Sequence, residues 1–140
     1  MTVKIDGSTG VDKVQPDSVD KEDLKWVPPF TKEYVSPEQT ITNNSSMTLL
    51  HGLGKAYKLC TVALKCVTAD LGYVPGDEVE MGVRQDHSTG AYGFNTSRSG
   101  DTGITIKVLS IGLYVHSAGG TSLGNTITPA NWRLIVRAWA

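Results

Sequence analysis

The stretch of residues 57–83, YKLCTVALKCVTADLGYVPGDEVEMGV, constrains the fold more than any other part of the chain. In residues 57–68 the side chains alternate between two faces of an extended segment. One face carries Cys60, Val62, Leu64 and Cys66, and the other carries Leu59, Thr61, Ala63 and Lys65. A helix would scatter these apolar residues, and Val, Thr and Cys favour extended structure. The pattern therefore predicts a buried β-strand.

A second strand is expected directly after the first. Residues 69–76 contain two glycines and a proline, which are typical of a turn and break regular structure. Residues 77–83 then alternate again, with Val79, Met81 and Val83 on one face and Glu78 and Glu80 on the other. One apolar and one charged face indicate a half-buried strand at the edge of a sheet.

The closing segment, residues 132–140 (WRLIVRAWA), is also predicted to be a strand, and it is apolar on both faces. Ile135 and Trp139 oppose Leu134 and Val136 in the period-two pattern. A terminal strand of this kind is expected either in the centre of a sheet or at a contact between subunits.

The remaining pattern predicts short strands separated by turns. Strands are expected at residues 33–41 and 46–53, joined by the polar turn 42–45, and at residues 104–109 and 112–117, which are expected to pair. Residues 85–99 and 118–130 are expected to be long loops. With six or seven short strands and no long helical period, the chain is predicted to be all-β, an antiparallel β-sandwich.

The N-terminal region differs in composition from the rest. Residues 1–29 are rich in charged side chains and have few apolar positions, so they cannot bury much surface alone. The segment KWVPPF, residues 25–30, forms the boundary, and its Trp26 and Phe30 supply more apolar area than a free linker needs. We therefore expect an extended N-terminal arm over residues 1–30 and a β-sandwich head domain over residues 31–140.

Charge and hydropathy exclude several classes of partner. The formal net charge of the 140-residue chain is −1, which does not favour nucleic acid or an anionic membrane surface. No apolar run approaches the roughly 20 residues that span a bilayer, and residues 1–10 lack the apolar core of a signal peptide. We expect synthesis in a cytoplasm, without insertion in a membrane.

The two cysteines, Cys60 and Cys66, lie in the same predicted strand. Six residues of strand separate their Cα atoms by roughly 20 Å, whereas a disulfide needs about 4.4–6.8 Å. The pair is predicted to be reduced and to pack in the core.

Sequence motifs of catalysis and metal binding are lacking. There is no GxSxG, P-loop, GxGxxG after a strand, HExxH or CxxC. The histidines, His51, His87 and His116, are isolated from one another, although copies from three subunits can meet on a threefold axis to hold a metal. Asp86, His87 and Asp101 flank a glycine-rich loop, where solvated carboxylates are commoner than acid–base catalysts. We predict no enzyme activity, no cofactor and no metal.

The same polar loop holds the best candidate set for ligand binding. Aromatic rings stack on sugar rings, and amide and guanidinium groups bond to hydroxyls. The candidate contacts for a glycan are His87, Tyr92, Phe94, Asn95 and Arg98. An ordinary solvated turn remains the alternative for this loop.

Three sets of residues together resemble a known family. VKIDGSTGVDKVQ at residues 3–15, with DSV at 17–19, resembles the N-terminal region of tail-fibre-like proteins of tailed bacteriophages. HGLG at 51–54, LKC at 64–66 and GYVPGDEV at 72–79 resemble the globular domain that follows in such proteins. NWRLIVRAWA at 131–140 resembles the end of those domains. In outline the family is similar to trimeric β-sandwich heads, including H-type lectins.

This resemblance implies a virion protein that forms a homotrimer and contacts other phage proteins of the tail or the capsid. The apolar residues of the arm would anchor it, namely Val3, Ile5, Val11, Val14, Trp26 and Phe30. The subunit contact would include Trp132, Ile135 and Trp139. No collagen-like, heptad or β-helical repeat supplies a fibre shaft. Two functions follow, a tail-fibre-like appendage whose head binds a host-surface glycan, or a capsid decoration protein that cements the head lattice.

Overall fold

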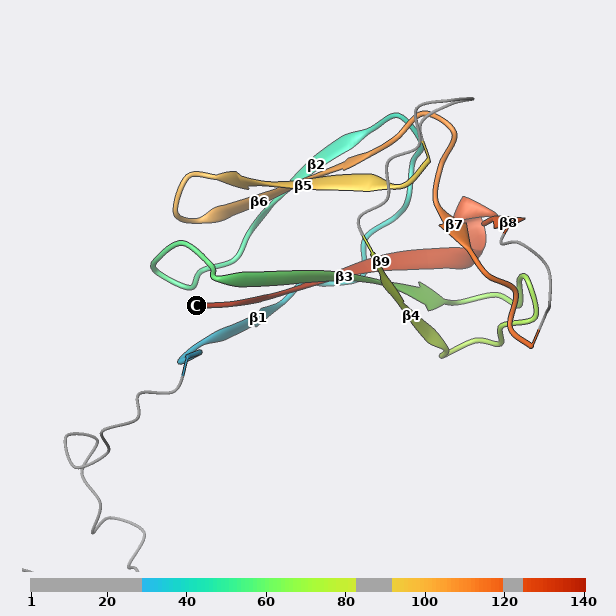
Figure 1. Cartoon of the computed structure of the whole chain (residues 1–140), viewed down its shortest axis with the longest axis horizontal. Helices are drawn as coiled ribbons and strands as arrows, with labels where there is room; N and C mark the ends of the chain where they lie inside the picture. The colour runs from blue at the N-terminus through green and yellow to red at the C-terminus, as the bar shows by residue number, and fades with distance from the viewer. Residues whose placement is uncertain (1–28, 83–91, 120–124) are drawn as a thin grey trace, which may run out of the picture.

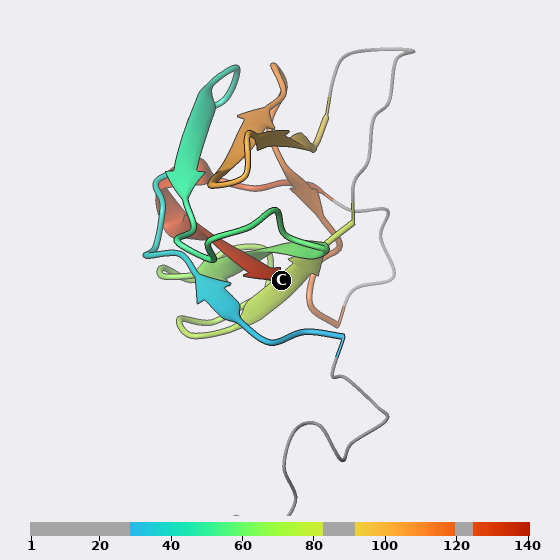
Figure 2. The same ribbon diagram turned by 90° about the vertical axis from the view of Figure 1, so that its left-hand side faces the viewer.

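The computed structural model describes residues 29–82, 92–119 and 125–140. Within these ranges the chain is all-β, with antiparallel strands in two stacked sheets (Figure 1), which confirms the predicted fold class. Figure 2 turns the end that carries the C-terminus toward the viewer. The predicted anchor residues Val3, Ile5, Val11, Val14 and Trp26 lie outside the described residues, as does His87.

The four-stranded sheet has the order β1-β9-β3-β4. Its strands are β1 (Glu33–Val35), β9 (Trp132–Trp139), β3 (Leu59–Cys66) and β4 (Glu78–Met81). β3 and β9 pair over eight residues each, from Leu59 opposite Trp139 to Cys66 opposite Trp132. The closing strand β9 is therefore central in its sheet, which is one of the two positions that the sequence predicted for it.

The three-stranded sheet has the order β2-β6-β5, built from β2 (Ser46–Leu50), β6 (Gly103–Val108) and β5 (Phe94–Ser99). A small pair, β7 (Tyr114–Val115) with β8 (Asn125–Thr126), lies at one end of the stack (Figure 1). The 3₁₀ turn η1 (Pro129–Asn131) then leads into β9.

The core fills the space between the two sheets. The four-stranded sheet contributes the alternate residues Val62, Leu64, Cys66, Trp132, Leu134, Val136 and Ala138. The three-stranded sheet contributes Phe94, Ile104, Ile106 and Val108. Period-two alternation places these side chains on the inner faces. The buried face predicted for residues 57–68 is confirmed for Val62, Leu64 and Cys66.

Both cysteines are free thiols, as predicted. Cys66 is fully buried, whereas Cys60 is only half-buried because it lies near the end of β3. Burial raises the pKa of both thiols above the usual value. Each thiol therefore stays protonated at neutral pH.

A single carboxylate fixes the turn between β3 and β4 to the start of β9. Asp70 Oδ2 accepts hydrogen bonds from the indole Nε1 of Trp132 at 2.9 Å and from the backbone N–H of Thr128 at 2.8 Å. The turn itself passes through the left-handed region at Leu71 and Gly72, with φ of 54° and 86°. A leucine there is strained, so the Asp70 contacts help to hold this backbone in place.

The expected strand at residues 33–41 is shorter in the structure. Regular pairing stops after Val35, although Gln39 forms an isolated bridge to Leu134. Pro37 has no N–H to donate, and the Ser36 hydroxyl takes the place of a backbone acceptor for the N–H of Val136 at 3.0 Å.

Two further expectations were wrong. Within the predicted loop 85–99, Phe94–Ser99 forms β5, because its polar side chains suit an edge strand with one face in solvent. The segments 104–109 and 112–117 do not pair with each other. β6 instead lies between β2 and β5, and β7 pairs with β8.

Candidate binding site

Exposed apolar side chains gather on the outer face of the four-stranded sheet, around Trp139. Leu59, Trp139 and Glu33 stand side by side in the register, and Val35 follows two residues along β1. Val35 and Leu59 are 52% and 44% exposed, and Trp139 is half-buried. Phe30 is 39% exposed and packs on Trp139, with the ring centroids 6.5 Å apart. We call Phe30, Val35, Leu59 and Trp139 the Trp139 patch.

The described chain enters the head at this patch. The backbone N–H of Thr31 donates to the carbonyl of Ala140 at 2.8 Å, and Lys58 Nζ donates to the carbonyl of Pro29, also at 2.8 Å. These contacts place the first described residues beside the C-terminus (Figure 1). Pro29, the first described residue, therefore lies next to the Trp139 patch.

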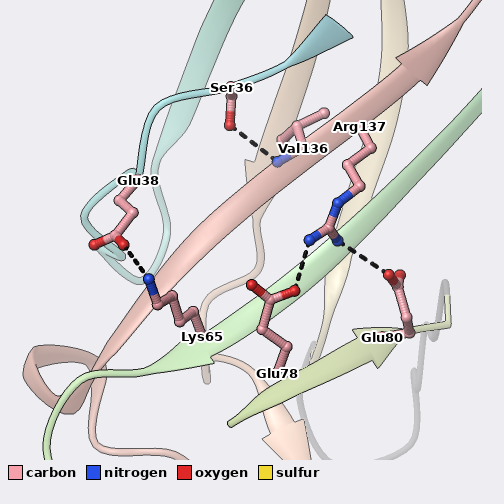
Figure 3. Close-up of polar contacts among 7 residues, drawn as sticks. All are labelled: Ser36, Glu38, Lys65, Glu78, Glu80, Val136 and Arg137. Atoms are coloured by element: carbon pink, nitrogen blue, oxygen red, sulfur yellow. Dashed lines mark hydrogen bonds and ion pairs between the residues drawn. The ribbon is translucent and has the colours of Figure 1, made fainter. Parts of the chain in front are cut away.

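Beyond the patch, the same face carries ion pairs that Figure 3 shows. Arg137 extends from β9 across β3 to Glu78 and Glu80 on β4, with N–O distances of 2.6 and 3.1 Å. Lys65 pairs with Glu38 at 2.7 Å. The hydrogen bond to Glu78 is the main reason that the pKa of Arg137 lies above its usual value. The guanidinium therefore stays charged.

The three residues predicted for the subunit contact occupy different environments. Trp132 has no exposed surface in the single chain, so its assignment to a contact is corrected and it belongs to the core. Ile135 lies on the outer face but is only 7% exposed, between the charged side chains of Arg133 and Arg137. Trp139 alone of the three offers substantial surface to a partner.

A cavity of about 360 Å³ lies between β4 and the β7 region. Its walls are Val79, Glu80, Met81 and Gly82 on one side and Tyr92, Gly93, Tyr114, Val115 and His116 on the other. The rings of Tyr92 and Tyr114 pack together, with centroids 5.7 Å apart and planes tilted by 60°. We call this cavity the tyrosine pocket.

Backbone pairing positions both tyrosines. Tyr92 forms a parallel bridge with Gly112, and the N–H of Gly93 donates to the carbonyl of Gly112 at 2.8 Å. Gly93 and Gly112 have φ of 100° and 110°, which L side chains rarely adopt. Tyr114 belongs to β7 and pairs with Thr126. The aromatic wall is therefore built before any ligand arrives.

The opposite wall brings the edge of β4 and a thioether to the pocket. Among the described residues β4 is an edge strand that pairs with β3, so alternate backbone N–H and C=O groups of β4 face the pocket side. Glu80 also lines the pocket, but its carboxylate bonds to Arg137 on the outer face of the sheet (Figure 3), and Met81 contributes an adaptable apolar surface. The backbone carbonyl of His116 accepts the Tyr73 hydroxyl at 2.9 Å, which fixes that side of the rim.

The structure separates the residues predicted to contact a glycan. Tyr92 lines the tyrosine pocket, but Phe94 is 1% exposed and packs in the core, which corrects its assignment. Arg98 donates to the carbonyl of Tyr57 at 2.5 Å and lies over the Tyr57 ring, 5.0 Å from its centroid. Asn95 lies opposite Lys107 on β6, away from the pocket.

Sequence reasoning missed most of the pocket. Tyr114, His116, Glu80 and Met81 come from strands that are distant in sequence from Tyr92. One signal was present, because Tyr114 and His116 alternate with the buried residues Leu113 and Val115. That alternation marks Tyr114 and His116 as outward-facing.

A second cavity, of about 390 Å³, lies between the sheets at the ends of β4 and β5. Cys60, Thr61 and Thr96 are among its lining residues. The buried hydroxyl of Thr61 has no hydrogen-bond partner among the residues that the structure describes. Because the thiol of Cys60 is protonated at neutral pH, this cavity does not present an activated nucleophile there.

The two described histidines, His51 and His116, lie in different environments. His51 is buried between the rings of Tyr34 and Tyr57, and its Nδ1 accepts the N–H of Leu53 at 3.2 Å. It therefore packs the core edge, whereas His116 lies on the pocket rim. Among the residues that the structure describes, no three His, Cys, Asp or Glu side chains lie close enough to share a metal ion.

Searches found no matching protein-family model, no matching curated protein and no matching solved structure. In the described ranges, no helix is both long enough and apolar enough to cross a membrane.

Proposed function

We propose that the chain is a structural protein of a bacteriophage virion, a small trimeric appendage similar to a tail fibre. Its N-terminal arm anchors it to other virion proteins, and its β-sandwich head binds a glycan on the host surface. The resemblance of residues 3–15, 51–54, 72–79 and 131–140 to tail-fibre-like proteins supports this assignment.

The Trp139 patch is the observation that carries the proposal. Several large apolar side chains are exposed together on one sheet face, and such a cluster marks an interaction surface on a soluble protein. It lies where the arm joins the head, so assembly of the heads and attachment of the arm take place on the same side of the molecule.

Three copies bury this surface if each patch contacts a neighbour around a threefold axis. A closed ring of this kind has the same contact repeated three times and leaves no patch exposed. Trp139 and Phe30 are the natural centre of the contact, because large aromatic residues dominate interface energies.

Light scattering on the full-length protein tests assembly. We expect a particle of three times the 15.0 kDa mass of one chain. The double variant Leu59→Ser with Trp139→Ala should shift the mass toward a single chain. Leu50→Ser is the matched control, because Leu50 is 75% exposed but lies on the other sheet. A stable single chain for the wild type at micromolar concentration contradicts the trimer.

Electron microscopy of particles from the phage that encodes the chain tests the location. Gold-labelled antibody at the tail supports the appendage, whereas label spread over the capsid supports the decoration function. Deletion of residues 1–25, or Trp26→Ala, should reduce incorporation into particles while the head remains folded. Incorporation at the wild-type level after the deletion contradicts anchoring by the arm.

A further inference from the structure

We propose that the tyrosine pocket is the glycan site of the head and that it binds one uncharged sugar ring, a hexose or an N-acetylhexosamine. The inference rests on the proposed function, since it identifies where and what the head binds. It replaces the set of contacts expected from sequence with Tyr92, Tyr114, Met81, His116 and the backbone edge of β4.

The two tyrosines give the pocket an aromatic wall. Sugar rings present a face of C–H groups that packs on an aromatic ring, and the Tyr92 and Tyr114 rings meet at 5.7 Å in the cavity wall. Both rings sit on paired backbone, so little conformational entropy is lost when a ligand binds. The cavity volume of about 360 Å³ lies within the range of small-molecule sites, about 300–1,000 Å³.

The edge of β4 supplies polar groups that a sugar requires. Among the described residues this edge has no partner strand, so it offers backbone donors and acceptors to which the hydroxyls or the N-acetyl amide of a sugar can bond. Opposite it, His116 and the two tyrosines line the cavity.

The charge of the pocket selects against acidic sugars. Among the described lining residues there is no lysine or arginine, and the one carboxylate, that of Glu80, is paired with Arg137 on the outer face of the sheet. A uronic or sialic acid would therefore place its own carboxylate in the cavity without a cation to compensate it. An uncharged ring avoids this cost and keeps the contacts with the tyrosines.

An extended peptide added to the edge of β4 is the competing occupant. Such additions gain affinity from main-chain hydrogen bonds along a strand. β4 has only four residues, and Tyr92 and Tyr114 stand across the cavity from it. A strand of that length offers few hydrogen bonds, so a compact ring suits the space better.

Titration calorimetry and saturation-transfer NMR on the full-length protein test the proposal. The probes are the methyl glycosides of glucose, galactose, N-acetylglucosamine and N-acetylgalactosamine, with methyl glucuronide as the acidic probe and an uncharged Thr/Val octapeptide as the peptide probe. We expect binding of at least one neutral glycoside and no detectable binding of the glucuronide or the peptide.

Single substitutions test whether the glycoside binds in the tyrosine pocket. Tyr92→Ala and Tyr114→Ala should each weaken the binding of the neutral glycoside at least tenfold, because each removes an aromatic face from the cavity wall. Tyr92→Phe keeps the ring and should stay within about threefold of the wild type. Thr48→Ala, on the outer face of the other sheet, is the matched control and should bind like the wild type.

Three results overturn the assignment: no neutral glycoside binds, the glucuronide or the peptide binds more tightly, or Tyr92→Ala and Tyr114→Ala bind like the wild type. Incorporation of Tyr92→Ala into particles is measured alongside and should be normal. A wild-type protein that reaches the particle but binds no neutral sugar refutes this inference and leaves the virion assignment standing, whereas a wild-type protein that does not reach the particle refutes the proposed function.

Discussion

The outer faces of the two sheets differ in what they expose. On the four-stranded sheet this face carries the Trp139 patch, a nearly buried Ile135 and a set of ion pairs around Arg137. On the three-stranded sheet it carries hydroxyls, a lysine and one exposed large apolar side chain, Leu50, with Thr48 and Thr105 joined by a hydrogen bond of 2.9 Å. The first face therefore resembles a contact surface, and the second resembles ordinary solvated sheet.

The difference between the two sheets shows that some strands are buried on both faces and others on one face only. Ala63 on β3 and Ile135 on β9 point outward and are still buried, whereas the outward residues of β2 are exposed. An outward apolar residue in a central strand is covered by the long side chains of its neighbours, as Arg137 reaches across β3 to β4.

The largest expected effect on stability comes from replacing the two tryptophans of β9, which lie on opposite faces of the four-stranded sheet. Trp132 faces the core and Trp139 faces outward. Trp132→Ala should lower the free energy of unfolding by about 3–5 kcal/mol, because it leaves a large cavity in the core. Trp139→Ala should cost about 1–2 kcal/mol in the single chain, since its ring is only half-buried. Urea denaturation at a concentration that keeps the chain monomeric measures both.

Equal losses for the two variants would contradict the division of β9 into an inner and an outer face. In the proposed trimer, by contrast, the cost of Trp139→Ala should rise with protein concentration, whereas the cost of Trp132→Ala should not.

The next largest effect on stability is expected at Asp70, which bonds to the core residue Trp132. Asp70→Ala leaves the indole N–H of Trp132 and the backbone N–H of Thr128 without an acceptor. The free energy of unfolding should fall by about 1.5–3 kcal/mol, mainly because the indole N–H of the buried Trp132 loses its charged acceptor, whereas the exposed Thr128 N–H can bond to water. Asp70→Asn keeps one acceptor oxygen and should lose clearly less. If Asn and Ala cost the same, the two hydrogen bonds are not what stabilises this turn.

The central strands could be predicted from sequence because their patterns are long. Residues 57–68 alternate over many positions, and residues 132–140 are apolar on both faces. Both signals come from burial on a pleated strand, which depends only on local spacing. The edge elements gave no such signal, since β5 is polar and β7 has two residues.

The tyrosine pocket could not be predicted from sequence, for a topological reason. Its walls come from β4, residues 92–93 and residues 114–116, and they meet only because the sheets stack. The expected cluster of Tyr92, Phe94 and Arg98 assumed a loop, where these side chains would share one surface. In the structure Phe94 and Arg98 lie on β5 and turn inward, opposite Val108 and Ile104.

The smallest expected effect is on the salt dependence of stability, which compares charged residues on the two outer faces. Arg137 holds two carboxylates and has a side chain that is only partly exposed, whereas Lys107 is exposed on β6 of the other sheet. Arg137→Gln should lower the free energy of unfolding by about 0.5–1 kcal/mol, and the loss should shrink at high salt as the ion pairs are screened. Lys107→Gln should change it by less than about 0.5 kcal/mol at any salt concentration. Denaturation midpoints of both variants, measured at about 0.05 and 1 M sodium chloride, distinguish Arg137 from Lys107. If both variants respond equally to salt, the ion pairs of the four-stranded sheet make no specific contribution to stability.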